Sequence, residues 1–148
     1  MSILRDTLFV SSILCACYAC SSSPRPEHSP AARGSASSQI EAGKAVYVEH
    51  CAACHGDAGQ GSKKAPALVG SAALPLDPRP GQKRAAKFHT AMDIALFATK
   101  NMPPDESDRA ELSTPDYWNV LAFALSANGV KLEQPVGPDN AAAIVLHP

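Results

Sequence analysis

Two cysteines and a histidine near the middle of the chain are the side chains best suited to chemistry. Cys51 and Cys54 are separated by two alanines, and His55 follows the second cysteine directly. On a turn of helix, this spacing sets two sulfur atoms close together with an imidazole beside them. Thiol and imidazole groups ligate metals, exchange electrons as a disulfide pair or attach a cofactor. The rest of the sequence has to discriminate among these chemistries.

The rival chemistries need residues that the body of the chain does not supply. A zinc site takes four ligands, and no second Cys pair or Cys-His pair follows at metal spacing. A thioredoxin-like pair follows a strand in a βαβ unit, and no such pattern occurs here. A structural disulfide between Cys51 and Cys54 leaves His55 unexplained. The motif is instead the attachment signature of a c-type haem, so we predict one covalent haem c on Cys51 and Cys54, with His55 on the iron.

Three segments begin with the same helix-start signature, a Ser or Thr followed three residues later by an acid. The signature predicts a cap at the hydroxyl residue and a helix after it. The caps and helices are Ser38 with residues 40–53, Thr90 with residues 91–100, and Ser113 with residues 115–127. Asn128 and Gly129 predict the end of the last helix.

The segment between the first two helices, residues 56–87, is rich in Pro and Gly and predicts a loop. A loop of that length is unusual in a small domain unless it wraps around something rigid. The chain has only one Trp, three Tyr and four Phe, which is few for a conventional core. We therefore predict an all-α fold of three main helices, with long loops wrapped around the haem.

Several further motifs occur in an order that resembles class I cytochromes c. The resemblance extends over about residues 38–130. The motifs are Gly43 and Tyr47 before the cysteines, Ala65-Pro66-Ala67-Leu68 and Asn101-Met102-Pro103-Pro104 after them, and Tyr117 to Phe123 with Asn128-Gly129 at the end. The family implies the cytochrome c fold, in which the first and last helices cross near Gly43.

The same resemblance implies roles for individual residues. His55 would be the proximal iron ligand and Met102 the distal one. The carbonyl of Pro66 would accept a hydrogen bond from the His55 ring and orient it. His89 is the alternative distal ligand. Met92 is explained by core packing, and His50 lies on the attachment helix and cannot reach the opposite face of a haem.

The first 37 residues predict a targeting signal followed by a linker. Residues 1–20 contain a short apolar run typical of a signal peptide. The cysteines after it resemble a bacterial lipoprotein signal, which leaves Cys17, Cys20 or no lipid as alternatives. Residues 21–37 predict a flexible linker. The cytochrome c domain would then span 38–134, with a tail at 135–148 packed on it.

The net charge and the distribution of charged residues indicate which kinds of partner the chain could bind. The formal net charge of −1 argues against a nucleic-acid binder. Basic residues predominate from Lys63 to Lys100 and acidic ones from Asp105 to Asp116, an asymmetry that would steer a redox partner or simply be solvated. A His/Met iron has no open position, so we expect an electron carrier rather than an enzyme. It would be periplasmic or membrane-tethered and exchange electrons with a dehydrogenase, an oxidase or another cytochrome. The alternative is a cytochrome subunit or dedicated electron acceptor of a quinoprotein-type dehydrogenase.

Overall fold

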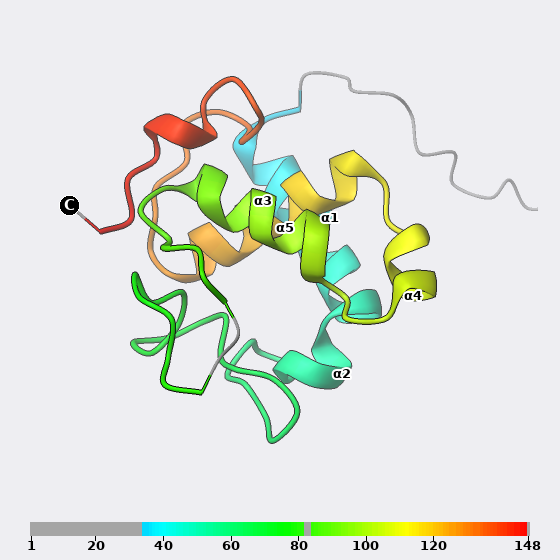
Figure 1. Cartoon of the computed structure of the whole chain (residues 1–148). Helices are drawn as coiled ribbons and strands as arrows, with labels where there is room; N and C mark the ends of the chain where they lie inside the picture. The colour runs from blue at the N-terminus through cyan, green and yellow to red at the C-terminus, as the bar shows by residue number, and fades with distance from the viewer. Residues whose placement is uncertain (1–33, 82–83, 148) are drawn as a thin grey trace, which may run out of the picture. The chain divides into compact units, whose positions relative to one another are not determined.

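The computed structural model describes residues 34–81 and 84–147 (Figure 1). The predicted signal peptide, with Cys17 and Cys20, and most of the predicted linker lie outside the described residues. Over the described ranges the chain forms five α-helices, one 3₁₀ turn and no strand, which confirms the predicted all-α class. None of the helices in these ranges is both long and apolar enough to cross a membrane.

The first helix, α1 (Ala36–His50), begins earlier than predicted. Its cap is Ser35, whose side chain accepts a hydrogen bond from the Ser38 N–H at 3.2 Å, so the predicted cap at Ser38 is wrong. The additional turn buries Ala36, and it brings the Gln39 amide against the tail. That amide donates to the Val136 carbonyl at 2.8 Å and accepts from the Val136 N–H at 2.7 Å. These tertiary contacts outweigh the capping signature at Ser38.

The attachment motif also interrupts the predicted first helix. α1 ends at His50, Cys51 leaves helical geometry with φ −120° and ψ −34°, and a separate short helix, α2 (Ala52–His55), follows. The predicted continuous helix over 40–53 is therefore two helices. The break turns α2 away from the axis of α1 and presents its end to the loop that follows.

The other two predicted helices start where their signatures place them. In α3 (Ala91–Asn101), the Thr90 hydroxyl accepts from the Asp93 N–H while the Asp93 carboxylate accepts from the Thr90 N–H. In α5 (Thr114–Ala127), Ser113 and Asp116 form the same reciprocal pair. Gly129 has a φ of 84° just after α5, in the left-handed region that glycine tolerates best. Both capping boxes and this stop confirm the sequence patterns.

Two short elements have no strong signal in the sequence. Helix α4 (Glu106–Ala110) lies between α3 and α5 and is capped by Asp105, whose carboxylate accepts from the Ser107 N–H at 2.8 Å. A single 3₁₀ turn, η1 (Ala141–Ala143), forms in the tail. Elements this short lack the periodic apolar residues on which sequence-based prediction depends.

The helices pack around the crossing of α1 and α5 (Figure 1). At Gly43, a Cβ atom would lie 1.8 Å from the carbonyl oxygen of Asn119, so only glycine permits this approach. One turn further along α1, Tyr47 is buried, and the centroid of its ring lies 5.1 Å from that of Phe123. The tail packs on α3, where the Ala91 N–H donates to the Ile144 carbonyl at 3.0 Å. Helix α3 also contacts α5.

Candidate functional site

A largely apolar cavity of about 410 Å³ lies between α3 and α5 on one side and α2 with its following loop on the other. Such a volume is typical of sites for cofactors and other small molecules. Apolar side chains from distant parts of the sequence line it, among them Leu68, Leu74, Phe97, Val120 and Leu121. The loop over 56–81 thus has something to wrap around, as its length requires.

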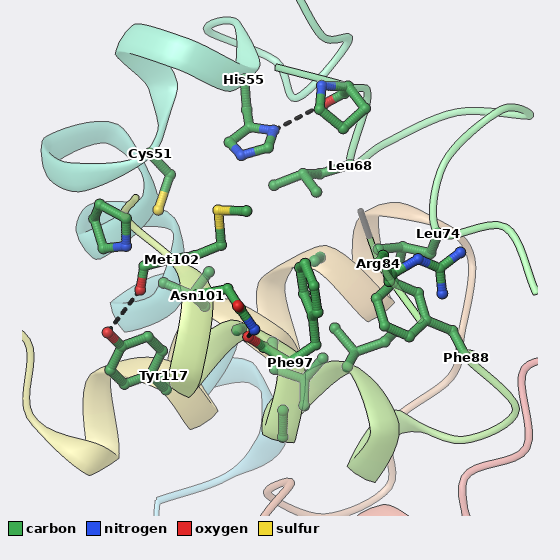
Figure 2. A pocket seen from close by; sticks show the side chains of 18 of the residues that line it. Cys51, His55, Leu68, Leu74, Arg84, Phe88, Phe97, Asn101, Met102 and Tyr117 are labelled. Atoms are coloured by element: carbon green, nitrogen blue, oxygen red, sulfur yellow. Dashed lines mark hydrogen bonds between the residues drawn. The ribbon is translucent and has the colours of Figure 1, made fainter. Parts of the chain in front are cut away.

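Four of the five predicted site residues line this cavity: Cys51, His55, Pro66 and Met102. Figure 2 shows the sulfur of Met102 pointing into the space that Cys51 and His55 also face. Cys54 is absent from the lining; it lies on α2, partly exposed, and forms no disulfide with Cys51. The structure therefore brings together residues that are up to 51 positions apart.

The His55 ring has a fixed hydrogen-bonding direction. It is buried, with 8 % of its surface exposed, and its Nδ1 lies 2.7 Å from the Pro66 carbonyl oxygen. A carbonyl oxygen only accepts, so Nδ1 must carry the hydrogen. The other ring nitrogen, Nε2, then keeps its lone pair, which is the state in which histidine ligates a metal.

Backbone hydrogen bonds in the loop after α2 bring Pro66 to this position. The Gly61 N–H donates to the His55 carbonyl at 2.7 Å, which turns the chain back toward α2. Gly61 has a φ of 85°, and a Cβ atom there would lie 2.6 Å from the Ala67 nitrogen. Glycine at this position therefore lets the loop segment that carries Pro66 approach His55.

Met102 stands at the C-terminal end of α3. Its N–H donates to the Ala98 carbonyl at 2.8 Å, and its carbonyl accepts from the Tyr117 hydroxyl at 2.7 Å (Figure 2). One guanidinium nitrogen of Arg109, on α4, lies 2.7 Å from the carbonyl oxygens of both Pro103 and Pro104. Sequence reasoning missed Arg109 and Tyr117, and the only signal was that Arg109 is the one basic residue between Asn101 and Asp116.

The alternative ligands lie elsewhere. His89 is exposed and absent from the cavity lining, and its carbonyl accepts from the Leu146 N–H. Met92 packs against the hydrophobic core, as its position on α3 predicts. His50 lies at the end of α1 with its ring 3.8 Å from Glu49 and 4.0 Å from Glu111. None of the three lines the space that Met102 faces.

The thiol of Cys51 does not have the electrostatics of a redox-active pair. Burial, with a smaller contribution from Cys54, raises its pKa to about 11. Catalytic and redox cysteines have lowered pKa values because the thiolate is their reactive form. Within the described ranges, moreover, no three His, Cys, Asp or Glu side chains gather to hold a free metal ion. An apolar cavity with one imidazole and one thioether suits a metal carried by a large apolar ring.

Two arginines, Arg79 and Arg84, line the cavity wall. The guanidinium of Arg84 lies 3.8 Å over the Phe88 ring and donates to the carbonyls of Pro75 and Ala86 at 2.9 and 2.6 Å. Burial lowers the pKa of Arg84 from its usual value, although an arginine stays charged. A haem has two carboxylates on an otherwise apolar ring, so a cation on an apolar wall agrees with that cofactor.

Comparisons with known proteins agree with this geometry. The family described as "Cytochrome C oxidase, cbb3-type, subunit III" matches residues 38–123. Thiosulfate dehydrogenase of Stutzerimonas stutzeri (strain A1501) is 37% identical over 84 residues, which are 57% of this chain and 26% of that protein. A chain in the crystal structure of the sulfane dehydrogenase SoxCD from Paracoccus pantotrophus superposes with a TM-score of 0.54 at 27% identity.

That superposition covers 72% of this chain and 52% of the solved one. The chain thus spans about a quarter of the length of the thiosulfate dehydrogenase and about half of the solved chain. The family match, in contrast, extends over more than half of this chain and includes the attachment motif. The chain therefore belongs to the c-type cytochromes of the cbb3-type subunit III family, electron-transfer proteins with covalently bound haem c.

Proposed function

We propose that Cys51 and Cys54 hold the haem, that His55 and Met102 are its two axial iron ligands, and that the chain passes single electrons without catalysing a reaction of its own. The observation that carries this proposal is that the buried His55 ring and the Met102 side chain line one apolar cavity from different elements. When bound there, the haem supplies a reversible one-electron change at iron.

The protein's own part is to hold the ligands and exclude water. The Pro66 carbonyl, 2.7 Å from Nδ1, fixes the His55 ring and leaves Nε2 directed away from Pro66. The apolar wall would keep water from a bound haem iron, and one thioether with one imidazole as its ligands would raise the reduction potential relative to two imidazoles. If His55 and Met102 both bind the iron, it has no position left for a substrate, which supports a carrier rather than an enzyme.

We further propose that the electron donor is a dehydrogenase acting on a sulfur compound. Two similar proteins support this partner class, because one is named thiosulfate dehydrogenase and the other sulfane dehydrogenase. A quinoprotein-type dehydrogenase is the alternative donor. Rapid mixing of the oxidised cytochrome with each class of reduced enzyme distinguishes them, and reduction by neither would contradict both assignments.

The place of action follows from residues 1–37 of the sequence. The short apolar run and the linker support an extracytoplasmic cytochrome, with lipid on Cys17 or Cys20 as a tether. The variants Cys17→Ser and Cys20→Ser, followed by membrane fractionation and mass measurement of the mature protein, test the tether. Soluble protein with no added acyl mass before either substitution would exclude it.

The central test is spectroscopic. Purified holoprotein should show a reversible one-electron redox spectrum with the weak far-red band of oxidised Met-ligated haem. Ferrous protein should bind carbon monoxide slowly at neutral pH, because the sixth position is already filled. Rapid binding of carbon monoxide without that band would mean an open iron and would favour an enzyme.

A further inference from the structure

The loop that follows α3 is held by side chains rather than by its own backbone. Proline has no N–H, so Pro103 and Pro104 donate no backbone hydrogen bond. Their carbonyls and that of Met102 are instead acceptors. The Tyr117 hydroxyl donates to Met102, and Arg109 donates to Pro103 and Pro104, each at 2.7 Å. Three successive carbonyls therefore have side-chain donors.

These donors come from two further helices. Arg109 belongs to α4 and Tyr117 to α5, while the Met102 N–H is bound to Ala98 within α3. Met102 is thus fixed on its amide side by one helix and on its carbonyl side by another. Figure 2 shows the Tyr117 hydroxyl meeting the Met102 carbonyl while the Met102 sulfur points the other way, into the cavity. Fixing the backbone in this way fixes the direction of the thioether.

Both donors are suited to a permanent contact. A phenol has an ordinary pKa of about 10, so the Tyr117 hydroxyl carries its hydrogen at neutral pH and can donate. Arg109 is half-buried, and its guanidinium is a cationic donor. Hydrogen bonds from a charged donor are stronger than those between neutral groups.

We infer that Tyr117 and Arg109 are positioning residues that hold the Met102 thioether on the iron and keep its sixth position closed. This inference rests on the proposed role of Met102 as distal ligand. The fraction of molecules with an open loop depends on the free energy that holds the loop shut. Loss of one hydrogen bond should raise that fraction about two- to tenfold.

The test compares holoprotein variants by the rate at which ferrous protein binds carbon monoxide. Tyr117→Phe removes only a hydroxyl, and Arg109→Lys keeps the charge but removes the planar guanidinium, one nitrogen of which reaches both proline carbonyls. The matched control is Tyr47→Phe, which also removes a tyrosine hydroxyl bound to a backbone carbonyl, that of Gly56 near the attachment motif. We expect Tyr117→Phe and Arg109→Lys each to bind carbon monoxide about two- to tenfold faster than wild type, and Tyr47→Phe to bind at the wild-type rate.

The outcomes separate the inference from the proposed function. If wild type shows the far-red band, Met102→Ala lacks it, and both variants bind no faster than wild type, then Met102 is the ligand and the positioning role is wrong. If Met102→Ala keeps the band, the ligand assignment itself fails, and the inference fails with it. Equal acceleration in Tyr47→Phe would show general loosening and would also overturn the positioning role.

Discussion

The orientation of one side chain determines what the site can bind. His55 contacts the Pro66 carbonyl through Nδ1, which commits the ring to one tautomer and leaves Nε2 as the basic nitrogen. Met102 enters the same cavity with a thioether, a weak acceptor that carries no proton. The two groups differ in chemistry, and the proposed function adds one requirement, that both bind the haem iron.

Substitution of Met102 tests that requirement most directly. Met102→Ala should abolish the far-red band of the oxidised protein and open the iron to carbon monoxide, because neither His89 nor Met92 lines the cavity to replace it. His89→Ala is the control, since its side chain is exposed and outside the lining. Absorption spectra of both oxidised variants give the answer. A band lost in His89→Ala and kept in Met102→Ala would reverse the assignment.

A second residue gives a pH dependence. The Thr90 N–H, and to a lesser degree its hydroxyl, lower the pKa of Asp93 against the opposing effect of burial. Its folded pKa then lies below the unfolded value of about 4, so the stabilisation is present above that value and lost as pH falls through the folded pKa. Asp93→Asn should lower Tm at pH 7 and change it little near pH 2. Thermal unfolding at both pH values measures this.

The control for that experiment is Glu41→Gln, which removes a carboxylate from the exposed face of α1. It should leave Tm at pH 7 within about 3 °C of wild type, because isolated surface substitutions change stability by less than about 0.5 kcal/mol. A loss of Tm in Asp93→Asn that is the same at both pH values would point to packing instead of the carboxylate.

At the scale of single residues, the sequence by itself predicted only those site residues that are adjacent in the chain. Cys51, Cys54 and His55 are neighbours in the chain, so their chemistry is visible without a fold. Pro66 and Met102 were predicted only through resemblance to a family. Arg109 and Tyr117 act on backbone carbonyls of the Met102 loop, a contact with no side-chain pattern of its own. No spacing rule predicts it.

Helix boundaries show where local rules hold and where tertiary contacts replace them. The capping boxes at Thr90 and Ser113 involve only residues within one turn, and both form as predicted. Helix α1 is capped by Ser35 instead of the predicted Ser38, and a hydrogen bond from Gln39 to Val136, 97 positions away, adds a long-range contact to its first turns. Long-range partners of this kind are outside the reach of local sequence rules.

The crossing of α1 and α5 depends on one glycine. In Gly43→Ala the new methyl would lie 1.8 Å from a backbone oxygen of α5, so the helices would have to separate. We expect a loss of about 1–3 kcal/mol in the free energy of unfolding, as for overpacked cores. Denaturant titration of the holoprotein measures it. Gly137→Ala, where nothing lies within 4 Å, should be nearly neutral, and equal losses would refute the close-packing argument.

At the scale of the whole described domain, a cavity takes part of the space that a core would fill. Buried side chains of several elements, among them Ile94, Leu121 and Leu125, form a core cluster, but the side of the domain that faces the loop over 56–81 borders about 410 Å³ of space. The sequence predicted this arrangement through its long loop and its few aromatic residues. The sequence did not predict the helix α4 or the 3₁₀ turn in the tail, because short elements are set by what they pack against.

The haem should therefore decide whether the chain folds. Without the haem, the apolar side chains that line this cavity would be left unpacked or exposed to water, and either state costs stability. We expect Cys51→Ala/Cys54→Ala apoprotein to lose its near-ultraviolet circular dichroism and the amide protection of α5, while holoprotein under the same conditions keeps both. Cooperative thermal unfolding of the apoprotein would contradict this expectation, because α1, α3 and α5 would then be a sufficient core by themselves. The attachment motif would in that case add a cofactor to a chain that already folds. The cavity implies instead that the chain needs the haem held by this motif in order to fold.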